Sequence, residues 1–154
     1  MEPAQQHFTK IVFDSPTDRV RVVGTQAYRD AVWRAIGPPA ADAREPAGRA
    51  SWRGEALLEP ECDNPHDCNA VRVTVGGQTV GYLPRELAAR VQPALLALER
   101  RGTRAAVAAY ARGGFEWRSG ESAGERASAG LMLRLDPAEL LAAAEEAGPL
   151  DRAA

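Results

Sequence analysis

Cysteine, histidine, lysine and aromatic residues are all scarce in this chain of 154 residues. It contains two cysteines, two histidines, one lysine (Lys10) and nine aromatic residues. Two cysteines are too few for the disulfide scaffold that holds many small secreted domains together. The fold must therefore be held by an apolar core, and a reducing, cytoplasmic setting is expected.

Long hydrophobic runs are absent as well. No apolar stretch approaches the ~18 residues that a bilayer span requires. The first ten residues are polar and include Glu2, which does not fit a secretory signal peptide. We therefore expect no membrane partner and a cytoplasmic location.

Neither sign of charge is in large excess, because Lys and Arg total 19 while Asp and Glu total 21. This balance argues against a histone-like wrapper but leaves room for a local nucleic-acid face, since binding depends on where the charge lies. Residues 1–135 carry 18 basic and 16 acidic side chains, whereas residues 136–154 carry one basic and five acidic ones. The sequence thus indicates a mildly basic domain followed by an acidic C-terminal segment.

The spacing of apolar residues and the positions of Gly and Pro predict one domain of mixed strands and helices. Strands are expected at 8–13, 19–23, 71–75, 79–83 and 103–110. Helices are expected at 27–36, 84–101 and 137–147. Pro93 falls inside the second helix and predicts a kink or a division into two short helices. Gly76-Gly77 is expected to form a hairpin turn, and residues 38–49 and 113–130 are expected to be surface loops.

The segment 59–71 is the most informative part of the chain and reads EPECDNPHDCNAV. Asp and Asn side chains accept hydrogen bonds from nearby backbone N–H groups, and Pro65 restricts Asn64 to extended geometry. We expect Asp63, Asn64, Pro65 and Asn69 to hold this loop in shape. A rigid loop in front of a strand suits the presentation of polar groups to a ligand, although a purely structural turn has the same composition.

Two motifs at the right separation carry a family resemblance. The loop reads DNPHDCNAV over 63–71, and the junction that follows the hairpin reads VGYLPRELA over 80–88. These motifs resemble the HIRAN domain, whose pattern runs roughly DNPYDxNAV, then a hairpin, then VGYLxRExA. The resemblance extends over about residues 18–114 and includes the strands at 20–24 and 55–61.

This resemblance implies an α+β fold: a small OB-like β-barrel of about six strands with two or three accessory helices. It divides the chain into an N-terminal strand and extension (1–17), the barrel domain (18–114), and a loop, final strand and C-terminal helix packing on the barrel (115–154). In eukaryotic helicases of the helicase-like transcription factor type, such a domain grips single-stranded DNA at a free 3′-hydroxyl end. The resemblance is to the stand-alone, bacterial type of this domain; bacterial relatives occur alone or fused to nucleases and helicases.

The same resemblance implies which residues contact nucleic acid. Asp67 matches the position that accepts the proton of the 3′-hydroxyl. Tyr28 matches an aromatic site that stacks a base, an interaction worth about 1–3 kcal/mol. His66 stands where the family usually has Tyr, and its imidazole is able to stack or to bind a phosphate. Arg72, on the strand after the loop, is a candidate phosphate contact.

The chain departs from the DNA-binding pattern just after Gly24. The family carries an Arg and paired aromatic residues there, whereas this chain has Gln26 and Ala27 before Tyr28. Gln26 is still a candidate contact with nucleic acid, but it lacks the positive charge of the family Arg. We expect a non-enzymatic domain that binds nucleic acid, most specifically single-stranded DNA or DNA 3′ ends. The alternative is a protein-interaction or accessory module that keeps the barrel without binding DNA ends.

Two weaker alternatives involve metal ions. Cys62, His66 and Cys68 have the chemistry of zinc ligands but lack a fourth member, so the cysteines are otherwise a redox pair or two ordinary thiols. Four nearby carboxylates have the chemistry to bind Mg²⁺ in a nuclease; they belong to Glu59, Glu61, Asp63 and Asp67. We expect no cofactor. The expected partners are single-stranded DNA or DNA ends, together with a protein such as a helicase or nuclease.

Overall fold

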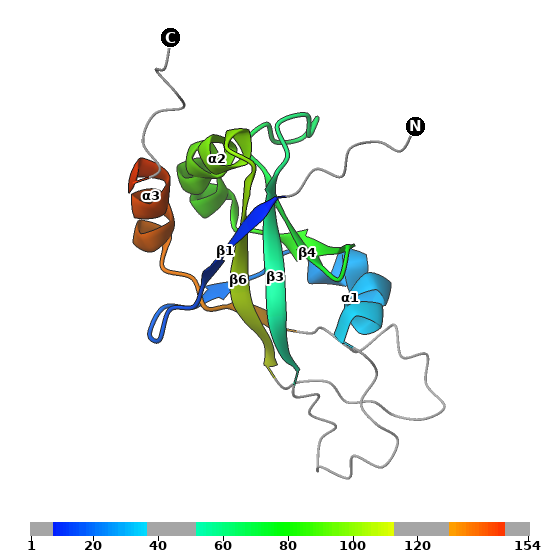
Figure 1. Cartoon of the computed structure of the whole chain (residues 1–154). Helices are drawn as coiled ribbons and strands as arrows, with labels where there is room; N and C mark the ends of the chain where they lie inside the picture. Colours follow the sequence, from blue (N-terminus) through cyan, green and yellow to red (C-terminus); the bar gives the residue numbers. More distant parts are fainter. Residues whose placement is uncertain (1–7, 37–51, 113–129, 147–154) are drawn as a thin grey trace, which may run out of the picture.

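A computed structural model describes residues 8–36, 52–112 and 130–146, which form one curled sheet and three α-helices (Figure 1). The expected loop at 38–49 lies outside these ranges, as does all but the last residue of the expected loop at 113–130.

Seven strands form the sheet, in the order β2-β7-β6-β3-β4-β5, and β1 pairs with β6 outside this path. Neighbours along the path are antiparallel, whereas β1 runs parallel to β6. The strands are β1 (Thr9–Phe13), β2 (Val20–Arg21), β3 (Arg53–Pro60), β4 (Val71–Val75), β5 (Gln78–Tyr82), β6 (Thr103–Arg112) and β7 (Gly130–Leu133).

An isolated bridge between Val23 and Tyr82 joins the two ends of this strand order. The two residues exchange both backbone hydrogen bonds, at 2.8 and 2.9 Å. One residue earlier, the N–H of Val22 donates to the carbonyl of Leu131 on β7 at 2.9 Å. The chain just after β2 therefore links β7 to β5, and the sheet closes as a small barrel.

Gly81 allows this closure because the backbone of another segment passes directly over it. A Cβ at this position would lie 2.5 Å from the carbonyl oxygen of Val23 and 2.6 Å from Cγ1 of Val22. A larger residue would push that segment away from β5. The close approach of Val22 and Val23 to β5 thus explains why glycine stands at position 81 in the VGYL sequence.

β6 lies at the centre of the sheet and contacts three strands. β3 pairs along one of its edges, while β1 and β7 divide the other edge between them. Alanine has low β-propensity, yet Ala105, Ala106 and Ala109 lie in this strand and are buried. Their small side chains suit a strand surrounded by other elements, which explains why packing overrides propensity here.

The expected hairpin turn at Gly76-Gly77 is confirmed. The two glycines have φ angles of 57° and 79° between β4 and β5. Positive φ at both central residues matches the right-handed twist of the flanking strands.

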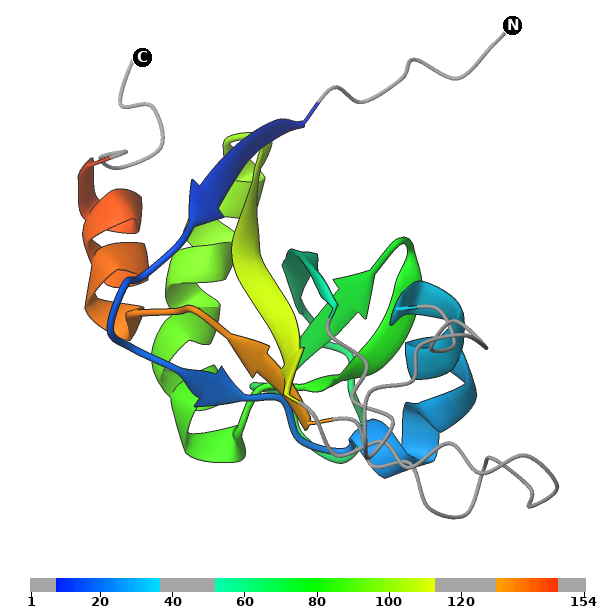
Figure 2. The same cartoon turned by 90° about the horizontal axis from the view of Figure 1, so that it is seen from below.

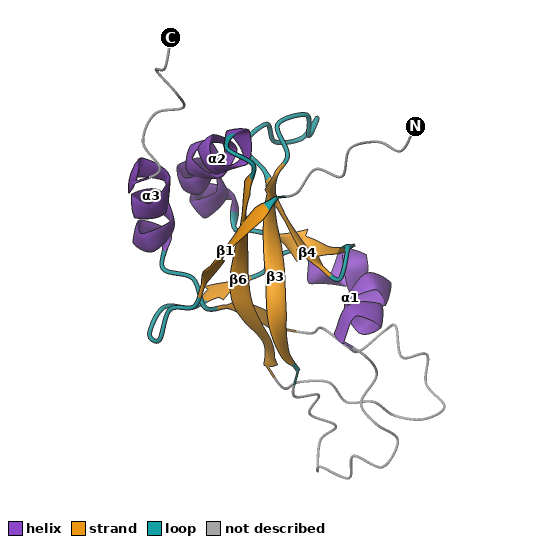
Figure 3. Ribbon diagram, viewed as in Figure 1, coloured by secondary structure: helices purple, strands orange, loops and turns teal. Residues whose placement is uncertain are grey.

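Helices lie on two sides of the barrel (Figures 2 and 3). A 3₁₀ turn at Thr25–Tyr28 leads into α1 (Arg29–Ile36), which packs beside β5. On the opposite side, α2 (Arg85–Arg100) packs against β3 and β6, and α3 (Pro137–Glu146) packs against α2. No helix in the described part of the chain is long and apolar enough to cross a membrane.

Of the two outcomes expected at Pro93, a kink or a division into two short helices, the division is wrong, because α2 is continuous through Pro93. Pro93 lies on the exposed face of the helix, while Val91, Leu95 and Leu98 are buried on the other face. Burial of each such side chain contributes about 1.5–3 kcal/mol, which offsets the loss of one helical hydrogen bond.

The core consists of the inward side chains of the barrel and the apolar faces of α1, α2 and α3. The largest fully buried residues are Val32, Val71, Val73, Val80, Val91, Leu98, Val107, Leu131, Leu133, Leu135 and Leu140. The expected α+β fold, an OB-like barrel with accessory helices, is confirmed. β1 and β7 belong to the same sheet as the strands that carry the two motifs.

Candidate functional site

Asn64 organises the loop between β3 and β4, which we call the 61–70 loop. Its side-chain oxygen accepts hydrogen bonds from the backbone N–H groups of His66 (2.8 Å) and Asp67 (3.2 Å). Its amide nitrogen donates to Oε1 of Glu61 at 2.8 Å. Both ends of the Asn64 side chain thus hold the turn.

The base of the 61–70 loop is tied to the barrel and to α2. The N–H of Glu61 donates to the carbonyl of Ala70 at 2.8 Å, which extends the pairing of β3 with β4. Gln92, on α2, is buried with 5% exposure and donates to the carbonyls of Cys68 (2.8 Å) and Ala70 (3.1 Å). A buried amide with two backbone acceptors anchors the loop firmly, because leaving such groups unpaired is unfavourable.

Beside this loop lies an open groove of about 480 Å³, which we call the loop groove. It is bounded by the loop itself, the chain after β2, the 3₁₀ turn, and the junction between β5 and α2. Its lining residues are Val23, Tyr28, Asn64, His66, Asp67, Ala70, Tyr82, Leu83 and Arg85. The groove therefore brings together three predicted contacts, Tyr28, His66 and Asp67, from two separate parts of the chain.

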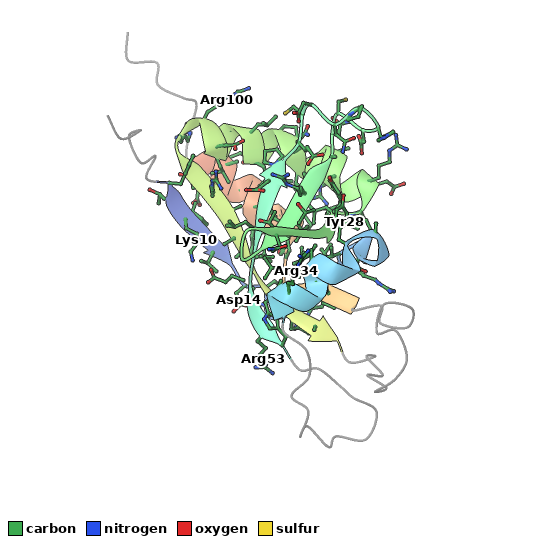
Figure 4. All side chains as sticks on the ribbon, turned by 90° about the vertical axis from the view of Figure 1, so that its right-hand side faces the viewer. Lys10, Asp14, Tyr28, Arg34, Arg53 and Arg100 are labelled. Carbon is green, nitrogen blue, oxygen red and sulfur yellow. The ribbon has the colours of Figure 1, made fainter. Side chains whose placement is uncertain are left out.

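Two tyrosines form the aromatic part of the loop groove. The ring centroids of Tyr28 and Tyr82 are 6.0 Å apart, with an angle of 48° between the ring planes. The hydroxyl of Tyr82 donates to the carboxylate of Glu61 at 3.1 Å. Burial, followed by the contacts with Tyr28 and Glu61, raises the pKa of Tyr82 above its ordinary value. Tyr82 is thus a neutral ring held in place, with Tyr28 (Figure 4) beside it.

Asp67 presents a half-buried carboxylate to the groove, with 22% of its side chain exposed. Oδ1 accepts a hydrogen bond from the backbone N–H of Asn69 at 2.9 Å. Oδ2 lies 3.7 Å from Nε of Arg85, whose side chain is 81% exposed. One carboxylate oxygen therefore fixes the loop, while the other faces Arg85, a long and exposed side chain at the edge of the groove.

Arg72 lies outside the lining of the loop groove. On the outer face of the barrel, its guanidinium donates to Oε2 of Glu59 at 2.9 and 3.2 Å and lies 3.7 Å from Glu61. Arg104, on β6, also pairs with Glu59, at 3.2 Å. The charge of the predicted phosphate contact is thus largely balanced by carboxylates.

The remaining predicted residues take several positions. Gln26 lies in the 3₁₀ turn that carries Tyr28, and its side chain is outside the described part of the structure. Asp63 and Pro65 are exposed on the 61–70 loop. Cys62 and Cys68 are exposed free thiols. Among the described residues, no group of three or more His, Cys, Asp or Glu side chains is placed to hold a metal ion.

Sequence reasoning did not single out Tyr82 or Gln92. Tyr82 stands within the VGYLPRELA motif, so its place in the family pattern was a usable signal. Gln92 gave no signal, because its role depends on contact between α2 and a loop more than 20 residues earlier in the chain.

OB-like barrels use their strands and adjoining loops to bind oligonucleotides or oligosaccharides, so the fold alone does not define the ligand. The family profile described as "HIRAN domain" matches residues 19–113, more than half of the chain. The chain therefore belongs to the HIRAN domain family, which is a family of nucleic-acid-binding domains.

Among solved structures, the chain is similar to the HIRAN domain of human HLTF. The match has a TM-score of 0.37 and 16% sequence identity, and it covers 82% of this chain and 87% of that one. No curated protein sequence matches the chain significantly.

Proposed function

We propose that the loop groove binds single-stranded DNA at its 3′ end, and that the protein acts by binding rather than by catalysis. The observation that carries this proposal is the meeting of Tyr28, His66 and Asp67 in one groove. A terminal nucleotide offers a base with two π faces, a free hydroxyl and a flanking phosphate. To bind them, a protein needs an aromatic ring for the base, a hydrogen-bond acceptor for the hydroxyl and a cation for the phosphate.

In the proposed complex, Tyr28 stacks on the terminal base and Asp67 accepts the proton of the 3′-hydroxyl. Oδ2 of Asp67 is the available acceptor, because Oδ1 is engaged by the N–H of Asn69. Arg85 contacts the flanking phosphate. It thereby supplies the positive charge that the chain lacks where Gln26 replaces the family Arg, and its 81% exposure leaves it free to turn toward a ligand.

Three substitutions test this arrangement by fluorescence anisotropy with a labelled single strand. Tyr28→Ala should weaken binding by about 1–3 kcal/mol through loss of stacking. Asp67→Asn should reduce the preference for a free 3′-hydroxyl. Arg85→Gln should lower the slope of log K against log salt by about 0.7, the value for one phosphate contact on a single strand.

Arg90→Gln is the matched control, because Arg90 is exposed on α2 and does not line the groove. It removes the same charge as Arg85→Gln and should leave both the affinity and the salt slope unchanged. Equal effects of the two substitutions would contradict a specific role for Arg85.

The alternative function, a protein-interaction module, is favoured by the pairing of Arg72 with Glu59 and Glu61. That pairing reduces the positive charge that a nucleic-acid strand would meet on β4. A partner captured equally well before and after nuclease treatment would support this alternative. A cytoplasmic location, and a helicase or nuclease partner that supplies DNA ends, form part of the leading proposal.

A further inference from the structure

A second hollow, of about 330 Å³, lies where the segment 14–19 meets β3 and β6. We call it the basic pocket, and its charged and aromatic lining residues are Asp14, Arg19, Arg53, Tyr110 and Arg134. It shares no lining residue with the loop groove. Figure 4 shows Asp14 and Arg53 at one end of the barrel, well away from Tyr28.

Two of the three guanidinium groups in the basic pocket are held by backbone carbonyls. Arg19 donates to the carbonyls of Ser15 (3.1 Å) and Asp18 (2.9 Å), and Arg134 donates to that of Ser15 (3.2 Å). The Arg19 guanidinium also lies over the ring of Tyr110, 5.8 Å from its centroid. These groups are fixed before any ligand arrives, which reduces the entropy lost on binding.

Positive charge exceeds negative charge in this pocket. Its one acidic residue, Asp14, pairs with Arg134. Arg53 stands directly opposite Tyr110 in the β3–β6 register and is exposed. Within the described ranges, Arg53 forms no ion pair and no side-chain hydrogen bond, so its donors face solvent.

The cations between the basic pocket and the loop groove are neutralised, which sets the pocket apart. Along the outer face of the barrel, Lys10 pairs with Glu55 at 2.7 Å. Further along, Arg72 and Arg104 share Glu59. A polyanion that follows this face would therefore find its next uncompensated positive charge at Arg53 and its neighbours.

We propose that the basic pocket binds a backbone phosphate of the nucleic-acid strand whose end occupies the loop groove. The planar, multi-donor guanidinium group matches phosphate oxygens, and three such groups converge here. This inference rests on the proposed function, because it requires that the protein binds a strand. It extends the contact from one terminal nucleotide to a footprint across the barrel, within the ~4–16 nucleotides that one OB fold covers.

The first test needs no nucleic acid. Inorganic phosphate is titrated into the ¹⁵N-labelled protein while backbone amide shifts are followed by NMR. Saturable shifts are expected at Gly54, Ala109 and Tyr110, with about tenfold weaker binding in Arg53→Gln, the loss expected for one charge-assisted contact. Arg100→Gln is the matched control, since Arg100 is exposed at the far end of α2 (Figure 4) and should leave the titration unchanged.

The second test compares a dinucleotide with a single strand of about 12 nucleotides, within the range that one OB fold covers. Arg53→Gln should lower the salt slope by about 0.7 for the longer strand and leave the dinucleotide unaffected. Asp67→Asn should weaken both ligands, which separates the two sites.

Each outcome bears on one site. If the longer strand binds with an affinity and salt slope that do not depend on Arg53, the inference is overturned even where the loop groove binds. The inference is also overturned if Arg53→Gln weakens the binding of phosphate but leaves the binding of single strands unchanged. That result would assign the pocket to a free phosphate or another anion. Failure of the proposed function would appear separately, as dinucleotide binding insensitive to Tyr28 and Asp67.

Discussion

Glu61 links the 61–70 loop to the aromatic part of the loop groove. Its carboxylate accepts hydrogen bonds from the side chains of Asn64 (2.8 Å) and Tyr82 (3.1 Å), and it lies 3.7 Å from Arg72. One acidic side chain thus holds the turn of the loop and the inner ring of the groove together. Its role is to position other residues, since it does not line the groove itself.

Tyr82 gives this arrangement a measurable pH dependence. Its pKa is raised above the ordinary 10.0 by burial, then by Tyr28 and Glu61. The folded protein therefore holds the phenol proton more tightly than the unfolded chain does. This contribution to stability is fully present below about pH 10 and is lost as the pH rises toward the folded pKa.

An ultraviolet titration of tyrosinate should accordingly contain a component that ionises well above pH 10, and Tyr82→Phe should remove it. A titration curve whose high-pH component survives the substitution would contradict the assignment to Tyr82. Denaturation in urea should return the wild-type curve to ordinary tyrosine behaviour.

Gly81→Ala tests the closure of the barrel at a single atom. The added methyl would overlap the backbone of Val23, so we expect a loss of about 1–3 kcal/mol in the free energy of unfolding. Urea denaturation measures this loss. Gly102→Ala is the control, since Gly102 has φ of 71° but open space around its Cβ position. Its loss of stability measures the cost of backbone strain without a steric clash. Equal losses in both variants would argue against the close approach.

At the scale of elements, α2 performs two tasks. Its apolar face packs on the barrel through Val91 and Leu95, and Gln92 holds the 61–70 loop from the same side. The helix therefore couples the stability of the core to the shape of the groove.

Gln92→Leu should loosen the loop more than the barrel. The substitution removes two hydrogen bonds to loop carbonyls, and we expect a loss of about 1–3 kcal/mol in stability. Hydrogen exchange should accelerate at the loop amides of Asp67 and Ala70, while amides of β6 serve as the internal reference. Uniform acceleration across loop and strand would show that the effect is global.

The sequence predicted those elements whose cause is local. Two adjacent glycines specify the hairpin at 76–77, and alternating valines specify β4, because turn geometry and burial act over a few residues. At Pro93 the sequence left a kink and a division into two helices as alternatives, since the continuity of α2 depends on burial of the opposite helix face against the barrel. The neutralisation of Arg72 was missed for the same kind of reason: Glu59 is opposite it only once β3 and β4 are in register.

At the scale of the whole molecule, the formal net charge is −2, but paired and exposed cations lie on different parts of the surface. On the outer face of β1, β3, β4 and β6, Lys10, Arg72 and Arg104 are paired with carboxylates, whereas Arg85 is exposed at the edge of the loop groove and Arg53 is exposed in the basic pocket. Composition placed the excess of basic residues before residue 136, but only the sheet register shows which of them are available. Affinity for a polyanion is therefore set by a few residues, and it should fall with salt concentration.

Recognition of the 3′ end is tested by comparing the affinities of the wild-type protein for one single strand prepared with a free 3′-hydroxyl and with a 3′-phosphate. Fluorescence anisotropy at low salt measures both. We predict about tenfold tighter binding of the free end, because the added phosphate removes the donor to Asp67 and places a like charge beside its carboxylate. Asp67→Asn should reduce this difference. Equal affinity for the two ends would contradict recognition of the 3′ end by the loop groove, and no binding of either strand would contradict the nucleic-acid function itself.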